Sequence, residues 1–388
     1  MKENPFKYLR RKNGEAFGPV IVKNWYVARD YVLDKLAKEC VYTPNDSRHL
    51  HVVVNGTAPL MLSVVRHLAL YAHFVNFKEV DVYGELACRN RTVITVVCDD
   101  EKIDIVQELS KEEYLGNLLN YCKYTLYGKP FNENSYLDVE INIVASADNL
   151  HDDISFVCEP SEVEAFNRGQ YDDVEQEDLI DTRKAVYASG MYKLGEVIDN
   201  IPAEDIHSAR RYSMALDVYQ YVQMDKSITS PLVDKSRWAR KENLSAVKEG
   251  ISNLFSSDCF VLRYNGMEEC WREIQSKKKE ERNSTFTTRR QLWEYYNEQL
   301  SNSEHSRWVV EKLIMGYRPL NDSERCKSER LSARERKAYL KELKTRSTDP
   351  AHIDLCNSAE LRRIDPDCRK YDSFIVLAIP VILDKVIG

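Results

Sequence analysis

The arrangement of hydrophobic positions in the first part of the chain predicts alternating strands and helices. Residues 49–56, HLHVVVNG, form a short apolar run that ends on glycine, which is typical of a buried strand. Residues 60–74, LMLSVVRHLALYAHF, follow at once and are apolar on nearly every side, as expected of a helix packed against a sheet. Three further strand patterns follow at residues 91–100, 137–146 and 153–160. This alternation favours a parallel α/β sheet.

The pattern changes after Glu159, where the chain loses its strand signals. Between Glu159 and Asp181 there are nine acidic residues and one arginine, so we expect an exposed linker here. The longer segments beyond it have helical periodicity and no interior proline, at residues 203–224, 235–255 and 287–316. A helix is also expected before the first strand, over residues 24–39 with Asn24 as its N-cap. The second half is therefore predicted to be mainly helical.

Composition and charge restrict the class of protein. The chain has 388 residues, of which 43% are hydrophobic and 30% charged, which excludes collagen-like and wholly disordered proteins. Its ten cysteines form no CxxC pair, so we expect reduced thiols and neither a zinc site nor a disulfide framework. No apolar run is long enough for a membrane span, and no apolar stretch follows the basic residues at the start. These features predict a cytoplasmic protein, and the net charge of −7 argues against nucleic acid as its main partner.

The first candidate site is the turn between the first strand and the helix that follows it. Gly56 and Thr57 lie where the N-terminus of a helix favours a phosphate, and Asp99 follows the next predicted strand and is a candidate partner for a ribose. However, Ala58 and Met61 stand where a dinucleotide fingerprint has its other glycines. The favoured interpretation is a Rossmann-like scaffold without bound nucleotide, and a dinucleotide site is the alternative.

The second candidate site is on the segment EHSRWVVEKLIMGYRPL, residues 304–320. At 100° per residue its aliphatic side chains form one face, whereas His305, Trp308 and Lys312 share another. An aromatic ring beside cationic groups suits an anionic aromatic ligand, because the ring stacks a base and the cations meet phosphate. Gly316 is expected to end the helix, and Tyr317 and Arg318 to form a second wall. In the structural alternative, Trp308 lies under another helix, Lys312 snorkels and His305 donates to a backbone carbonyl.

Two resemblances extend this interpretation. Residues 49–143 resemble the Rossmann-type regulatory domain of potassium-transport proteins, with HLHVVVNG and RTVITVVCDD as its first two strands. The helix at 304–317, the segments HIDLCNSAEL and IPVIL, and the YD pair between them resemble the ryanodine-receptor repeat domain found singly in bacterial proteins. That resemblance implies a small helical module that senses nucleotide-derived ligands and is often associated with antiviral signalling. It adds further candidate ligand-binding residues, namely His352, Tyr371 and Asp372.

The expected architecture has three parts. Residues 1–160 form a Rossmann-like α/β domain, residues 161–290 an acidic linker and helical connector, and residues 291–388 a helical domain of the ryanodine-receptor type. The predicted function is a sensor, acting as a homodimer, whose ligand is a nucleotide-derived small molecule such as an ADP-ribose-like compound or a cyclic nucleotide. The charged segment 324–346 is predicted to be mostly one solvated helix, with Leu331, Ala338, Tyr339 and Leu343 as its contact stripe and nucleic-acid binding as the less favoured alternative.

Two alternatives to the sensor stay open. The first is an enzyme that uses NAD or another nucleotide at Gly56 and Asp99, although the P-loop, HExxH and GxSxG signatures are all absent from the sequence. A related minor possibility is a metal or acid–base role for His49 and His51 on the first strand. The second alternative is a scaffold without a small ligand, in which the Trp308 face is a protein interface.

Overall fold

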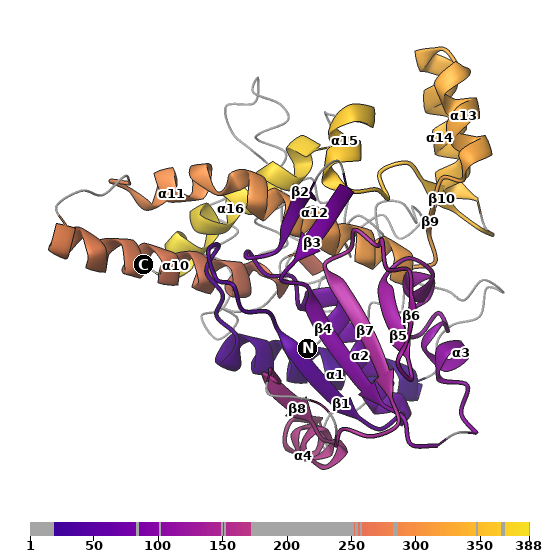
Figure 1. The fold of residues 1–388 in the computed structure, drawn as a ribbon, viewed down its shortest axis with the longest axis horizontal. Helices are drawn as coiled ribbons and strands as arrows, with labels where there is room; N and C mark the ends of the chain where they lie inside the picture. Colours follow the sequence, from indigo (N-terminus) through magenta and orange to yellow (C-terminus); the bar gives the residue numbers. More distant parts are fainter. Residues whose placement is uncertain are drawn as a thin grey trace, which may run out of the picture.

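The computed structural model describes most of the chain outside one long internal segment. The described residues are 19–171 except 83–84, 101, 149 and 151–152, then 252, 255–256, 258–281, 286–346, 348–365 and 369–387. The helices predicted over 203–224 and over most of 235–255 lie outside these residues. Within them, an α/β part and a helical part are both present (Figure 1).

The α/β part is built on a six-stranded sheet in the order β6-β5-β7-β4-β1-β8. Its strands are β1 (His51–Asn55), β4 (Thr92–Val97), β5 (Lys123–Leu126), β6 (Lys129–Phe131), β7 (Val139–Val144) and β8 (Phe156–Cys158). All neighbours are parallel except β5 and β6, which form an antiparallel hairpin at the edge. The four predicted strands correspond to β1, β4, β7 and β8, so the expectation of a mainly parallel sheet is confirmed.

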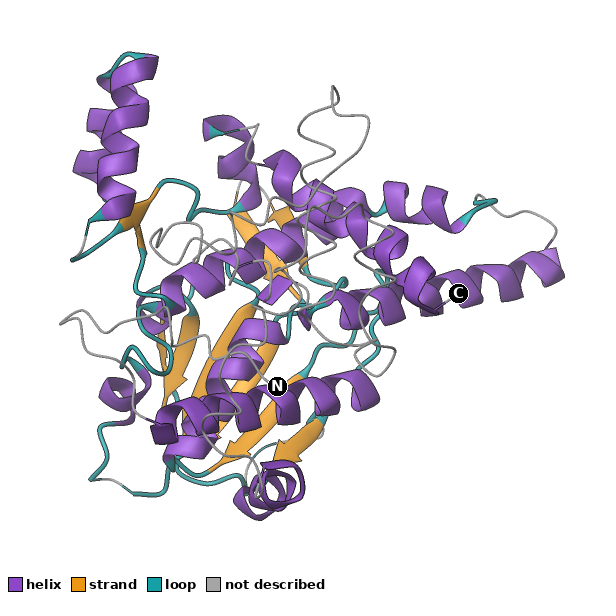
Figure 2. Cartoon of the chain, turned by 180° about the vertical axis from the view of Figure 1, so that it is seen from behind, coloured by secondary structure: helices purple, strands orange, loops and turns teal. Residues whose placement is uncertain are grey.

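Two helices cover one face of this sheet. Helix α1 (Pro19–Glu39) packs on α2 (Pro59–Tyr71), and α2 lies against β1 and β4 (Figure 2). From Met61 to Tyr71 every α2 residue is buried, as the all-round apolar sequence predicts. Pro59 stands in the first turn, where its missing N–H costs no intrahelical hydrogen bond. Asn24 lies inside α1 and is therefore not the N-cap that the sequence suggested.

A short hairpin separates α2 from β4. It consists of β2 (Lys78–Val82) and β3 (Glu85–Arg89), which pair antiparallel as a sheet of their own. A short helix, α3 (Ile105–Leu109), and a 3₁₀ turn, Leu118–Asn120, connect β4 to β5. None of these elements was predicted from the sequence, because they are short and lack a clear apolar period.

The helical part contains seven helices among the described residues. They are α10 (Phe260–Glu281), α11 (Arg289–Tyr295), α12 (Asn297–Ile314), α13 (Asp322–Arg330), α14 (Ala333–Thr345), α15 (Ser358–Ile364) and α16 (Arg369–Ile387). Two-residue strands β9 (Arg318–Pro319) and β10 (Ala351–His352) pair in parallel at the base of α13 and α14. Helix α12 packs on α16 and also contacts α2, so its aliphatic face shares one hydrophobic core with the sheet.

Three predictions about helices were wrong in detail. The acidic segment after Glu159 begins with a helix, α4 (Pro160–Tyr171), which packs on α1 and buries Val163; the rest of that segment lies outside the described residues. The single helix predicted over 287–316 is two helices, because the chain breaks at Tyr296. The charged segment is also two helices, since a capping box at Ser332 starts α14.

None of the described helices is both long enough and apolar enough to cross a lipid bilayer.

Candidate functional site

Helix α12 carries the second candidate site, and the α/β part holds the C-terminal end of this helix in place. Gly316 has φ +86° just after the helix, which is the left-handed conformation of a helix-ending glycine and confirms the predicted stop. Asn117 donates its backbone N–H to the Leu313 carbonyl at 2.9 Å, and its side-chain amide to the carbonyls of Gly316 at 2.9 Å and Tyr317 at 3.0 Å. The Leu313 carbonyl, near the end of the helix, also accepts from the Gly316 N–H at 3.0 Å, and the two side-chain bonds fix the residues that follow the helix.

Six of the predicted ligand-binding residues come together around one tryptophan. The Trp308 ring lies 6.0 Å from the His305 ring in a stacked arrangement and 5.0 Å from the His352 ring in an edge-on arrangement. The ammonium group of Lys312 is 5.7 Å from the centre of the Trp308 ring, within the range of a cation–π contact. Two members touch the histidines, namely Tyr317 beside His352 and Asp372 beside His305. We call these six residues the Trp308 cluster.

His305 is the positively charged histidine of the Trp308 cluster. Its Nε2 lies 2.9 Å from the Cys356 carbonyl oxygen, which accepts hydrogen bonds only, and its Nδ1 lies 3.4 Å from the Asp372 carboxylate. Burial lowers the pKa of His305, but hydrogen bonds to Asp372 and Cys356 and the charge of Asp372 outweigh it and raise the pKa to about 10. The imidazolium form therefore persists at neutral pH. The contact with a backbone carbonyl is the one that the structural alternative predicted.

His352 is the neutral histidine of the Trp308 cluster, and one of its nitrogens has no hydrogen-bond partner. Its Nδ1 accepts from the Asp354 backbone N–H at 3.2 Å, which places the ring proton on Nε2. Burial, together with the positive charges of Lys344, Lys312 and His305, holds the pKa of His352 well below its usual value. His352 Nε2 is buried without a hydrogen-bond partner among the described residues, so a donor is left free beside Trp308.

A buried network of charges lies behind the Trp308 cluster. Glu304 contacts Arg263 at 2.7 Å and accepts from Arg307 at 2.9 Å, while Glu311 accepts from Arg307 at 2.8 Å and from Lys312 at 2.6 Å. Four of these side chains are fully buried, and only Lys312 reaches outward to Trp308. Burial opposes ionisation of the two glutamates, but Arg307, with Arg263 or Lys312, lowers the pKa of both.

Most of this network was missed from the sequence. The four α12 members are 304, 307, 311 and 312, and the first three form a polar stripe that the helical wheel treats as a solvated face. Arg263 comes from α10, more than forty positions away, so no local spacing connects it to Glu304. The sequence did contain one signal of this network. Glu304, Arg307 and Glu311, at i, i+3 and i+7, place opposite charges next to one another on a helix that also has an apolar face.

Two predicted members lie apart from the Trp308 cluster. The Arg318 guanidinium donates to Glu324 at 2.7 and 2.9 Å and to Asp349 at 2.7 and 2.8 Å, so its donors hold β9 to the neighbouring loop and α13. The Tyr371 side chain is 43% exposed and contacts Phe374 edge-on rather than the cluster. A role for these two residues in ligand binding remains a prediction.

The first candidate site lies at the carboxyl ends of the central strands. Gly56 has φ +88° directly after β1, and its backbone N–H donates to the Val97 carbonyl of β4 at 3.1 Å. Thr57 is half-buried in the same turn, and Asp99 is exposed just beyond β4. The β2–β3 hairpin lengthens the connection between these strands, which explains why Asp99 is so far from Gly56 in sequence although β1 and β4 are neighbours.

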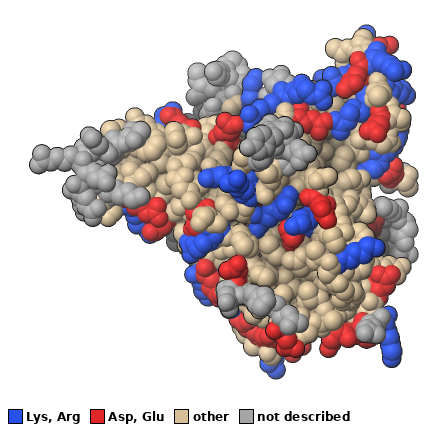
Figure 3. Space-filling view, in the orientation of Figure 1, with Lys and Arg blue, Asp and Glu red and all other residues tan. Residues whose placement is uncertain are grey.

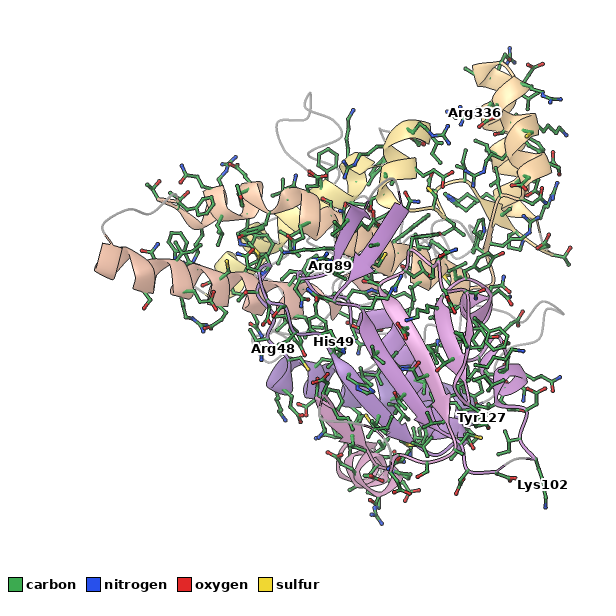
Figure 4. The ribbon with its side chains drawn as sticks, viewed as in Figure 1. Arg48, His49, Arg89, Lys102, Tyr127 and Arg336 are labelled. Carbon is green, nitrogen blue, oxygen red and sulfur yellow. The ribbon has the colours of Figure 1, made fainter. Side chains whose placement is uncertain are left out.

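The structure also places the two histidines near the first strand. His51 lies on β1, where its Nε2 is 2.8 Å from the Thr95 hydroxyl, and burial lowers its pKa. His49 precedes the strand (Figure 4). Among the described residues, no three His, Cys, Asp or Glu side chains are grouped closely enough to hold a metal ion.

Comparison of the chain with protein-family models, with curated proteins and with solved structures finds no match.

Proposed function

We propose that the protein is a ligand sensor and that the Trp308 cluster binds a nucleotide-derived anion. The observation that carries this proposal is a free donor on a buried histidine, His352 Nε2, beside an aromatic ring and two cations, His305 and Lys312. A phosphate meets the cations, the free N–H donates to a phosphate or ribose oxygen, and Trp308 packs against the base or sugar.

The charges around the cluster favour an anion. Among the described residues, the cations are Arg263, His305, Arg307 and Lys312, and the carboxylates in contact with them are Glu304, Glu311 and Asp372. This group therefore has one more positive than negative charge. Lys344, whose charge lowers the pKa of His352, and Asp354, whose carboxylate lies 3.5 Å from His352, add one charge of each sign and leave the excess unchanged. A net positive charge in the group of side chains that includes the half-buried ring of Trp308 favours an anionic ligand over a neutral one.

The test is a thermal-shift titration of the full chain with NAD, ADP-ribose and its cyclic forms, and cyclic mono- and dinucleotides. A ligand at about 100 times its Kd stabilises the folded state by about 2.7 kcal/mol, which is readily detected. We expect one class of ligand to give such a shift and Lys312→Gln to abolish it, because the substitution removes the ammonium beside Trp308.

Lys123→Gln is the matched control. Lys123 is also a partly buried lysine paired with a glutamate, Glu140 at 2.9 Å, but it lies on β5. If the ligand raises the unfolding temperature of both Lys312→Gln and Trp308→Phe as much as that of the unmodified chain, binding at the cluster is contradicted. The absence of any shift across the panel contradicts the sensor and supports a scaffold, for which a Trp308 variant is then expected to change the oligomeric state.

The carboxyl edge of β1 and β4 is a second candidate site. We infer this from the positive φ of Gly56 and from the neighbouring positions of Gly56 and Asp99, which together suit the phosphate and ribose of a dinucleotide used by an enzyme. In that case Asp99→Asn is expected to weaken binding of NAD, while Lys312→Gln leaves it unchanged. The opposite pattern assigns the ligand to the Trp308 cluster.

A further inference from the structure

The α13–α14 hairpin stands away from the rest of the molecule (Figure 1). The small core at its base is formed by Leu320, Leu343 and Ala351. Two predicted contact residues, Leu331 and Tyr339, are only partly buried, and Ala338 is exposed, which corrects the expected contact stripe. Most of the surface of the hairpin is thus available to a partner.

One side of α14 carries a row of cations. At 100° per residue, Arg334, Lys337, Lys341 and Lys344 fall within about 80° of one another. Both acidic residues of the helix, at positions 335 and 342, are separated from this row by at least about 80°. All four cationic side chains are exposed. Among the described residues, none of the four forms an ion pair or hydrogen bond with a carboxylate. We call these four residues the basic stripe.

The spacing of the basic stripe is regular. Intervals of three, four and three residues separate the cations by about 4.5, 6 and 4.5 Å along the helix axis. The whole segment 322–346 has nine basic and five acidic residues, a net charge of +4, although the chain as a whole is acidic. Lys and Arg side chains accordingly gather over the hairpin in Figure 3.

The surface around the basic stripe is polar, which bears on the kind of partner. A stable protein interface has an apolar centre, and the exposed side chains of α14 are charged or small. Interfaces with nucleic acid are more polar and positively charged, and regularly spaced cations contact successive phosphates. The position of the row on a projecting helix leaves it open to an extended polyanion.

We propose that the basic stripe of α14 binds the phosphodiester backbone of a nucleic acid, without reading its sequence. This inference does not depend on the ligand of the Trp308 cluster. Binding of this kind releases counterions, so affinity falls steeply as salt rises. The acidic charge of the rest of the chain restricts the contact to the hairpin.

The experiment is fluorescence anisotropy of labelled oligonucleotides of mixed sequence with the full chain. Single-stranded DNA, single-stranded RNA and duplex DNA are compared between about 50 and 200 mM KCl. Four phosphate contacts predict a slope of log K against log[salt] of about −3 for single strands. Lys341→Gln is expected to make the slope shallower by roughly one.

Lys102→Gln is the matched control, because Lys102 is also an exposed lysine but lies at the opposite end of the molecule from Arg336 of the hairpin (Figure 4). Its slope is expected to equal that of the unmodified protein, and circular dichroism verifies that both variants are folded. Equal slopes for Lys341→Gln and Lys102→Gln overturn the proposal, as does the absence of binding at the lowest salt. A salt-sensitive dimer that forms without nucleic acid and is lost in Lys341→Gln also overturns it, since the stripe then binds a second copy.

Discussion

Replacing Glu304 by glutamine is expected to destabilise the protein strongly. The substitution keeps the size of the side chain but removes the negative charge that faces Arg263 at 2.7 Å and Arg307 at 2.9 Å. Both guanidinium groups are fully buried, so neither has water to replace the lost carboxylate. Breaking a buried ion pair from one side typically costs about 3–5 kcal/mol. Since Arg307 keeps Glu311 and Arg263 loses its carboxylate partner, most of that cost is expected to arise at Arg263.

Urea unfolding followed by circular dichroism measures this cost. The control is Glu294→Gln, which removes an exposed i,i+4 pair with Arg290, worth about 0.3–0.5 kcal/mol. A second variant, Arg263→Met with Glu304→Leu, removes both charges and is expected to be more stable than the sum of its single substitutions predicts, because no lone charge stays buried. A loss below about 1 kcal/mol for Glu304→Gln, comparable to that of an exposed site, refutes the reasoning that the network is dry and tightly paired.

Two further predictions concern pH and close packing. The folded-state pKa of His305 is raised from 6.5 to about 10. The stability that the charged His305 contributes is therefore complete below pH 6.5 and is lost as the pH rises through 10. Asp372→Asn should flatten this dependence of stability on pH, measured by thermal unfolding between pH 6.5 and 10. Gly266→Ala in α10 should destabilise, because its Cβ collides with the Tyr42 carbonyl, whereas Gly169→Ala in α4 meets no atom and should be neutral or stabilising by up to about 1 kcal/mol. Equal midpoints for the two alanine variants in urea contradict the close contact at Gly266.

The parts of the sheet that the sequence predicted have a strong local signal. Strand β1 and helix α2 are apolar runs bounded by turn residues. The three valines of β1 and every α2 residue from Met61 onward are buried, so local pattern and tertiary structure agree. The β5–β6 hairpin could not be found in this way. Its strands are four and three residues long and lie at the sheet edge, where alternation is weak and position is decided by pairing with β7.

The candidate site was predicted where helical geometry alone decides contacts. His305, Trp308 and Lys312 lie on one side of α12 because their spacing requires it, and the structure confirms that proximity. Where contacts depend on tertiary packing, residue type was a poorer guide. Arg318 has the same charge as Lys312 but is held by Glu324 and Asp349, and neither partner could be assigned from sequence spacing.

Helix α12 connects the sheet, helix α10 and the Trp308 cluster, because its sides contact different parts of the molecule. Its aliphatic side packs in the core of the sheet, its charged side pairs with Arg263 of α10, and its third side forms the Trp308 cluster. Lys312 belongs to the last two, since it contacts Glu311 and the Trp308 ring. An anion that attracts Lys312 away from Glu311 leaves that buried carboxylate with Arg307, which is shared with Glu304. The charge network therefore provides a physical connection from the proposed ligand to the interface between α12 and α10. Its effect is measurable as a ligand-induced thermal shift that differs between Glu304→Gln and the unmodified chain, and equal shifts contradict the connection.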